Sequence, residues 1–225
     1  MDTKFIRQSG LWNPSEQRIK ITIIGVGSSG SFLAFTLAKM GFKDIEIIDF
    51  DTVELHNIPN QLYRIKDIGK YKVEALKEII KEFTDVDINA NNCKIRDYCY
   101  TPNIPSNLDV SMDRIYILAV DNIDARKYVY DTLKGSPLLM IDGGVGGEEY
   151  SCMVIELDNE EHQKKYEAYL NAEHKDLPCG FQNILYTVLS ECSEICNIVK
   201  RIDKKEKVPF TILRDMRSYK IIKGD

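Results

Sequence analysis

The sequence lacks the features that mark membrane, exported and nucleic-acid-binding proteins. No apolar run approaches the roughly 20 residues that span a bilayer, and the start, MDTKFIRQSG, has no hydrophobic core of a signal peptide. A basic surplus is also missing, because the net charge is −5, which argues against a nucleic-acid surface. We therefore expect a cytoplasmic protein that binds neither membrane nor nucleic acid.

Linkers and repeats are missing as well. No Pro/Gly/Ser-rich stretch divides the 225 residues, and this length suits one well-buried domain better than two. The six cysteines come without an export signal, so we expect reduced thiols that are mostly small core residues, Cys192 and Cys196 among them. The composition predicts a single globular domain over residues 1–225.

What is present is an alternation of apolar strands and amphipathic helices. The patterns predict strands at 18–25, 44–49, 114–120 and 137–144, and helices at 28–42, 70–83 and 123–135. This order, with short connections, predicts an α/β fold with a doubly wound, mainly parallel Rossmann-like sheet. Near the start, Asn13 followed by Pro14 predicts a capped short helix.

The pattern changes after Gly147. A strand over 150–157 precedes a polar segment, 159–175, which we expect to be an exposed helix or loop. A long amphipathic helix over 181–202 and a hairpin over 209–222 follow. Together these elements predict a C-terminal antiparallel extension of the sheet.

A glycine-rich turn joins the first predicted strand to the first predicted helix. Its sequence is Gly25-Val26-Gly27-Ser28-Ser29-Gly30. Glycine permits a tight turn and close approach of a phosphate, and the exposed N–H groups of the next helix attract negative charge. The strand–turn–helix context favours a nucleotide site over a plain connection, and both serines offer hydroxyl donors.

Two aspartates follow predicted strands. Asp49 ends the second strand roughly 20 residues beyond the glycines, where a carboxylate can accept both ribose hydroxyls of NAD or ATP. Asp121 lies just past the strand at 114–120, at the edge where open α/β sheets bind ligands. These positions predict a nucleotide pocket but do not choose between the two nucleotides.

The residues after Asp49 carry a family resemblance. The run Asp49-Phe50-Asp51-Thr52-Val53, then Asn57, Gln61, Gly69 and Lys72, resembles the ThiF/MoeB/HesA adenylating enzymes, which share their fold with ubiquitin-activating enzymes. Arg7-Gln8, Asp121-Asn122 through Arg126, and the glycine-rich segment 143–157 fit the same pattern in the same order. The likeness extends from about Ile6 to Ile202.

The resemblance implies ATP and Mg²⁺ as cofactors and a role for each matching residue. Lys72 would contact the phosphates, and Asp121 would hold the Mg²⁺ that bridges them. Asn57 and Gln61 would orient ribose and phosphate groups. The remaining nucleotide-binding positions would be Gly25, Gly27, Ser28, Ser29, Gly30, Asp49, Asp51 and Asn122.

Two further catalytic candidates follow from the resemblance. Arg7 would be an arginine finger that reaches the γ-phosphate of the neighbouring subunit in a homodimer. Many relatives pass the activated acyl group to a cysteine, and Cys179 stands beside a turn glycine before the long helix, where its thiol pKa can be lowered. We therefore count Cys179 as a candidate for a thioester or persulfide.

The implied reaction is adenylation of the C-terminal carboxylate of a small ubiquitin-like or sulfur-carrier protein ending in glycine. We expect an N-terminal arm and short helix at 1–17, a nucleotide-binding half at 18–147, and an acceptor-binding and dimerisation half at 148–225. The acceptor tail would pass above the turn 143–147, where GGVGG leaves room for a thin peptide.

Departures from the pattern keep alternatives open. Asn60 stands where the family usually has arginine, so either Arg64 substitutes or turnover is weak, as in a non-catalytic scaffold subunit. The C-x-x-C pairs of the family's structural zinc do not occur in the sequence. An NAD-dependent oxidoreductase would share the glycines and Asp49, and a relative acting on a short peptide or tRNA is a third alternative.

Overall fold

The computed structural model describes residues 3–98, 113–172 and 183–225. Within these ranges one eight-stranded sheet has the order β3-β2-β1-β4-β5-β6-β7-β8. The first five strands in the chain are parallel: β1 (Lys20–Ile24), β2 (Ile45–Asp49), β3 (Asn89–Asn92), β4 (Arg114–Leu118) and β5 (Leu139–Gly146). The last three are antiparallel: β6 (Glu149–Glu156), β7 (Thr211–Asp215) and β8 (Lys220–Gly224). The predicted α/β class, doubly wound sheet and antiparallel extension are confirmed.

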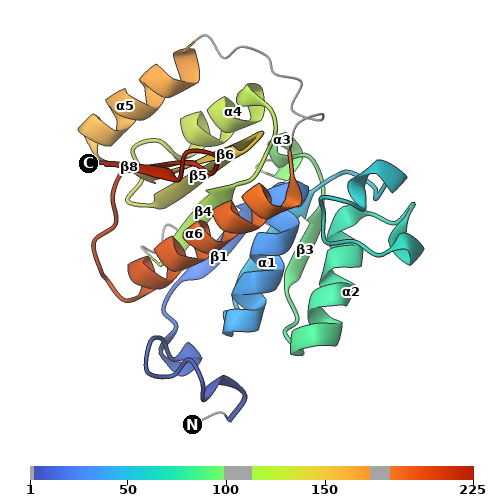
Figure 1. Cartoon of the computed structure of the whole chain (residues 1–225). Helices are drawn as coiled ribbons and strands as arrows, with labels where there is room; N and C mark the ends of the chain where they lie inside the picture. Colours follow the sequence, from blue (N-terminus) through green and yellow to red (C-terminus); the bar gives the residue numbers. More distant parts are fainter. Residues whose placement is uncertain (1–2, 99–112, 173–182) are drawn as a thin grey trace.

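Helices cover both faces of the sheet (Figure 1). One face carries α1 (Ser28–Met40), α2 (Lys72–Thr84) and the long α6 (Leu185–Asp203). The other carries α3 (Ile95–Tyr98), α4 (Ile123–Leu133) and α5 (Glu160–Asn171). Side chains alternate along β1, so that Ile21 and Ile23 join the first core and Ile24 the second. Burial on both faces explains the near-continuous apolar strands.

The sheet topology has a switch point between β1 and β4. These strands are parallel neighbours, but the chain leaves β1 for β2 on one side and β4 for β5 on the other. Open α/β sheets bind ligands at such a switch point, beyond the carboxyl ends of the strands. Gly25 and Asp121 therefore lie at this switch point, just beyond the carboxyl ends of β1 and β4.

Several local predictions hold at the level of single residues. Asn13 caps the 3-10 helix Pro14–Glu16, since its side-chain oxygen accepts the N–H of Ser15 at 3.2 Å. Gly41 ends α1 with a φ of 103°. Further 3-10 helices of the same length lie at Thr3–Phe5, Leu55–Asn57 and Ile65–Asp67.

Three features differ from the sequence-based expectations. The polar edge strand β3 was not predicted, because its residues, Asn-Ala-Asn-Asn, have low strand propensity. The segment expected to be exposed is the helix α5, which buries Tyr166 and Leu170. Residues 143–146 belong to β5 and pair with 149–152, so the expected five-residue turn is a tight hairpin.

No helix among the described residues is long and apolar enough to cross a bilayer.

Candidate nucleotide-binding site

Two glycines let α1 start against the sheet. Gly25 has a φ of 87°, and a Cβ there would lie 2.6 Å from the carbonyl oxygen of Ala119. A Cβ on Gly30 would lie 1.9 Å from the carbonyl oxygen of Gly25. Only hydrogen fits at these positions, and the first turn of α1 is therefore held directly above the ends of β1 and β4.

Asp49 shapes the turn through its carboxylate. One oxygen accepts the N–H of Val26 and the other accepts the N–H of Asp51, both at 2.8 Å. The residue is only partly buried. Since each carboxylate oxygen can accept more than one hydrogen bond, Asp49 can hold the turn and still receive a ribose hydroxyl.

Lys72 lies close to the carboxyl end of β2, beside the segment that follows this strand. Its ammonium lies 2.9 Å from a carboxylate oxygen of Asp51, and its backbone N–H donates to the Asp51 carbonyl at 2.9 Å. The Lys72 side chain is 8% exposed, whereas that of Asp51 is 49% exposed. Lys72 is therefore not a solvated lysine on a helix face: it reaches back from the start of α2 toward the segment that follows β2.

The loop between Val53 and Tyr63 folds back onto the turn. The buried Asn57 accepts the N–H of Glu54 at 2.8 Å through its side-chain oxygen. Tyr63 donates its hydroxyl to the Val26 carbonyl at 2.6 Å. Burial, reinforced by the charges of Asp49 and Asp51, raises the pKa of Tyr63, so the hydroxyl remains a donor.

Gln61 belongs to this loop and has an unmet acceptor. Its side-chain oxygen is buried and has no hydrogen-bond partner in the described part of the chain. Its side-chain nitrogen lies 3.9 Å from where a Cβ on Gly27 would stand. An unpaired buried acceptor is costly, so a polar group positioned beside this turn would relieve the cost.

Asp121 and Asn122 lie between the end of β4 and the start of α4. The side-chain oxygen of Asn122 accepts the N–H of Ala125 at 2.8 Å, which caps the helix. Its amide donates to the exposed Asp121 carboxylate at 3.4 Å. Asp121 is two residues beyond Ala119, the residue that contacts Gly25, and its carboxylate remains open to solvent.

Arg126 connects the segment after β4 to β5 on this side of the site. It is buried, donates to the carbonyls of Val120 at 2.7 Å and Gly143 at 3.0 Å, and forms an ion pair with Asp142. Asp142 in turn accepts the Tyr166 hydroxyl at 2.8 Å. Arg126 thus fixes the end of β4 to β5 and is not directed at a ligand.

The two serines of the turn have other acceptors for their hydroxyls. Ser28 donates to the Asn60 carbonyl at 3.0 Å, and Ser29 donates to the carboxyl of Glu191 on α6. The Cys192 thiol also contacts the Ser29 carbonyl at 3.3 Å. Backbone N–H groups, and not these hydroxyls, are therefore the donors that the turn offers to an anion.

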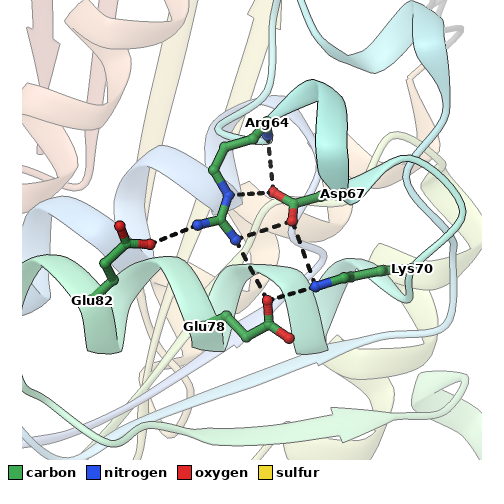
Figure 2. A network of polar contacts seen from close by, with 5 residues as sticks. All are labelled: Arg64, Asp67, Lys70, Glu78 and Glu82. Carbon is green, nitrogen blue, oxygen red and sulfur yellow. Dashed lines mark hydrogen bonds and ion pairs between the residues drawn. The ribbon is translucent and has the colours of Figure 1, made fainter.

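Asn60 and Arg64 do not supply the expected cation. Asn60 donates to the carbonyl of Asn183 at 2.7 Å and so connects the loop to the segment before α6. Figure 2 shows Arg64 held between Asp67, Glu78 and Glu82, at distances of 2.7, 3.5 and 2.7 Å. The suggestion that Arg64 replaces the missing arginine is therefore not supported, because its guanidinium is already neutralised.

The remaining candidates lie apart from the site or outside the described residues. Arg7 is exposed near the far end of α1, where the adjacent Gln8 donates to the Met40 carbonyl at 2.6 Å. Cys179 falls in the stretch 173–182, outside the described residues. Cys192 and Cys196 are buried core residues as expected, and burial raises the pKa of Cys196 to about 12.

Glu191 is the residue that sequence reasoning missed. It is fully buried where α6 meets both the glycine turn and β5. A signal was present, because Glu191 falls on the apolar stripe of the helix with Val188, Cys192 and Ile195. A carboxyl at such a position requires a specific partner.

Comparison with known proteins agrees with this geometry. The sequence model of the ThiF family matches residues 11–215, and the chain belongs to this family. The resemblance drawn from residues 6–202 is thereby confirmed at the level of the family.

Curated relatives include the NEDD8-activating enzyme E1 catalytic subunit of Arabidopsis thaliana, 32% identical over 171 residues. The match covers 69% of this chain and 36% of the relative. SUMO-activating enzyme subunit 2 of Dictyostelium discoideum is 32% identical over 133 residues, covering 58% of this chain and 19% of that protein. The chain thus spans about a third or less of these relatives.

Solved structures share the fold. E. coli MccB, crystallised with ATP, has a TM-score of 0.75 at 16% identity, covering all of this chain (100%) and 71% of MccB. PaaA has a TM-score of 0.73 at 21% identity, covering 94% of this chain and 65% of PaaA. The predicted Rossmann-like architecture is confirmed by these structures.

Proposed function

We propose that this protein binds ATP and Mg²⁺ and adenylates the C-terminal carboxylate of a small ubiquitin-like or sulfur-carrier protein. The proposal rests chiefly on one observation: Gly25 and Asp121 follow the two strands that flank the switch point, β1 and β4, while Asp49 and the Asp51–Lys72 pair lie at the end of the neighbouring strand β2 and Asp49 bonds to the glycine turn. Membership of the ThiF family and similarity to NEDD8- and SUMO-activating subunits support it.

Each residue has a distinct task in this reaction. A carboxylate oxygen attacks the α-phosphorus, the bond to the β-phosphate breaks, and pyrophosphate leaves. Because both reactants are anionic, the site must offset charge as they approach. The N-terminal N–H groups of α1 and the Lys72 ammonium would bind phosphate oxygens, while Asp49 and Asn57 would orient the ribose side.

Asp121 is suited to Mg²⁺. Among the described residues no three His, Cys, Asp or Glu side chains gather to hold a metal by themselves. Mg²⁺ needs no such cage, since it commonly binds one or two carboxylates together with phosphate oxygens and water. The exposed carboxylate of Asp121 fits that coordination, and the ion would supply charge neutralisation on the triphosphate.

The division of the chain into functional parts belongs to the same proposal. Residues 1–17 would form the arm, 18–147 the nucleotide-binding half, and 148–225 the acceptor-binding and dimerisation half. The acceptor tail would lie on the face of β5 that carries Gly144 and Gly146, because Glu191 and Ile195 fill the other face at Gly143. At Gly146 an added Cβ would meet nothing within 4 Å.

The test is ATP–pyrophosphate exchange with Mg²⁺ and candidate carriers ending in Gly-Gly. Asp121→Asn should abolish exchange. Asp124→Asn, which changes a carboxylate that is also exposed and lies three residues along the chain, should retain it. Absence of exchange with every carrier would contradict the proposal, as would an Asp121→Asn variant of full activity.

A second candidate function is supported by Asn60. Asn60 carries no charge, and Arg64 is already paired with Asp67, so neither residue supplies the missing cation. A subunit that binds ATP or a carrier without turnover, as a partner of an active homologue, is consistent with this loss. Nucleotide binding without pyrophosphate exchange, together with full biological activity of Asp121→Asn, would favour it. Preference for NADH over ATP would instead favour an oxidoreductase.

A further inference from the structure

Glu191 is a buried carboxyl with one satisfied and one unsatisfied oxygen. It is 0% exposed and accepts a hydrogen bond from the Ser29 hydroxyl in the first turn of α1. Its second oxygen has no hydrogen-bond partner among the described residues. That oxygen would lie 2.5 Å from a Cβ on Gly143, so glycine is what admits the carboxyl at this place.

The surroundings of Glu191 do not neutralise a negative charge. Arg126 is the nearby cation, but it is ion-paired with Asp142. The other titratable groups that interact with Glu191 are Tyr150 and Cys152 on β6 and Cys192 on α6, and Glu194 of α6 lies near Tyr150 and Cys152. Burial raises the pKa of Tyr150 to about 12 and raises those of both thiols, so these three groups stay neutral near pH 7.

The protonation of Glu191 bears on anion binding at the turn. Burial raises its pKa to about 7, against the lowering effects of the Ser29 hydrogen bond and Arg126. The ionised carboxylate lies at the N-terminus of α1, which is also where phosphate would bind. Two anions sharing one helix N-terminus repel, and the enclosed carboxylate has little solvent to screen it.

We propose that Glu191 is a positioning residue, which as a neutral acid holds Ser29 and the glycine turn in place. The turn then binds a nucleoside triphosphate best when Glu191 carries its proton. The inference rests on the proposed function, whose site it deepens. Nucleotide binding then takes up a proton, and affinity falls as Glu191 ionises. If only the protonated form binds, the dissociation constant rises about tenfold between pH 6 and pH 8.

The test compares the wild-type protein with Glu191→Gln, which keeps the shape of the neutral acid. Binding of α,β-methylene ATP with Mg²⁺ is measured by calorimetry between pH 6 and pH 8.5, in buffers of different ionisation enthalpy. The wild type should show the tenfold weakening and proton uptake beyond that of the variant. Because both proteins meet the same nucleotide and buffers, titration of the ligand cancels in the comparison.

A second measurement does not need nucleotide. A carboxyl whose pKa is raised by folding retains its proton in the folded state, so its presence lowers stability as pH rises from the ordinary carboxyl pKa toward 7. The melting temperature of Glu191→Gln should therefore increase relative to the wild type between pH 5 and pH 8. Ser29→Ala, which removes a hydrogen bond to the ionised form, should shift the midpoint of the pH dependence upward.

The outcomes separate this inference from the function on which it rests. Nucleotide binding with parallel pH profiles in the wild type and Glu191→Gln would overturn the role of Glu191 alone. Absence of binding to both proteins at every pH would overturn the proposed function and the inference with it. Should Glu191→Gln fail to fold, an unchanged midpoint in Ser29→Ala would overturn the inference.

Discussion

Gly27 and Gly30 lie in the same turn but differ in what a methyl group would meet. At Gly30 it would come within 1.9 Å of the Gly25 carbonyl oxygen, whereas at Gly27 the nearest atom is 3.9 Å away. Gly30→Ala must displace α1 from the sheet and should cost about 3 kcal/mol or more. Gly27→Ala should cost much less but should weaken nucleotide binding, because the methyl group would occupy the phosphate position.

Urea denaturation and nucleotide titration of both variants check this expectation. The two properties should separate, with stability lost at Gly30 and affinity lost at Gly27. Equal stability of the two variants would show that the tight contact between Gly30 and Gly25 does not hold the turn.

Sequence reasoning located the turn and both strand-end aspartates because these positions follow from strand order alone. It could not predict the partners of the side chains. The serine hydroxyls bond to Asn60 and Glu191, which are distant along the chain. Likewise, the family resemblance singled out Lys72, but only the fold shows that it pairs with Asp51. Such tertiary contacts leave no periodic pattern in the sequence.

Among the elements, the loop before α2 carries Asn57 and Gln61 and depends on the ionic cluster in Figure 2. Asp67 is fully buried at the centre of this cluster. Burial by itself would raise the pKa of Asp67, but hydrogen bonds from Arg64 and the nearby Lys70 outweigh it and lower the pKa. The cluster should therefore hold the loop in the shape that the site requires.

Removing the Arg64 guanidinium should destabilise the protein and change how its stability depends on pH. Arg64→Ala leaves the Asp67 carboxylate enclosed without its main partner, which should cost about 2–4 kcal/mol in urea denaturation. A depressed folded pKa contributes stability above the unfolded value and loses it as pH falls through the folded pKa. The free energy of unfolding of the wild type should thus decrease below about pH 4, as Asp67 takes up a proton. Arg64→Ala should not show this decrease.

Glu82→Gln is the matched control, because it removes an exposed carboxylate from the same guanidinium. The change should cost less than about 1 kcal/mol. A similar cost for both substitutions would mean that the buried Asp67 does not anchor the cluster.

On the scale of whole elements, the strands and helices around the switch point were predictable because the strands are near-continuous apolar runs and the helices have an apolar face. The extension after β5 was predictable only in outline. Its hairpin β7–β8 continues the sheet, but nothing in the sequence indicated that Ile221 and Ile222 of β8 are exposed. Tyr166 of α5 is buried against Tyr130 of α4, a contact that depends on another part of the chain.

For the molecule as a whole, the position of Arg7 limits how it can act. The glycine turn is at one end of α1, and the arm packs at the other, where Phe5 and Pro14 lie against Gly41. A helix of 13 residues separates these ends by about 18 Å. An arginine side chain does not span that distance, so a finger role for Arg7 requires the site of a second copy.

This arrangement predicts complementation between two inactive variants. Arg7→Ala should lack the finger, and Lys72→Met should lack the phosphate contact while keeping the aliphatic stem buried. Each alone should be inactive in pyrophosphate exchange. If Arg7 acts across a two-fold dimer, an equal mixture forms heterodimers in half of the assemblies, and each heterodimer has one intact site. The mixture should therefore recover about a quarter of wild-type activity.

Lys77→Ala changes an exposed lysine on the same helix α2, should stay active alone and serves as the control for Lys72→Met. No recovery in a mixture shown by mass spectrometry to contain heterodimers would rule out action in trans.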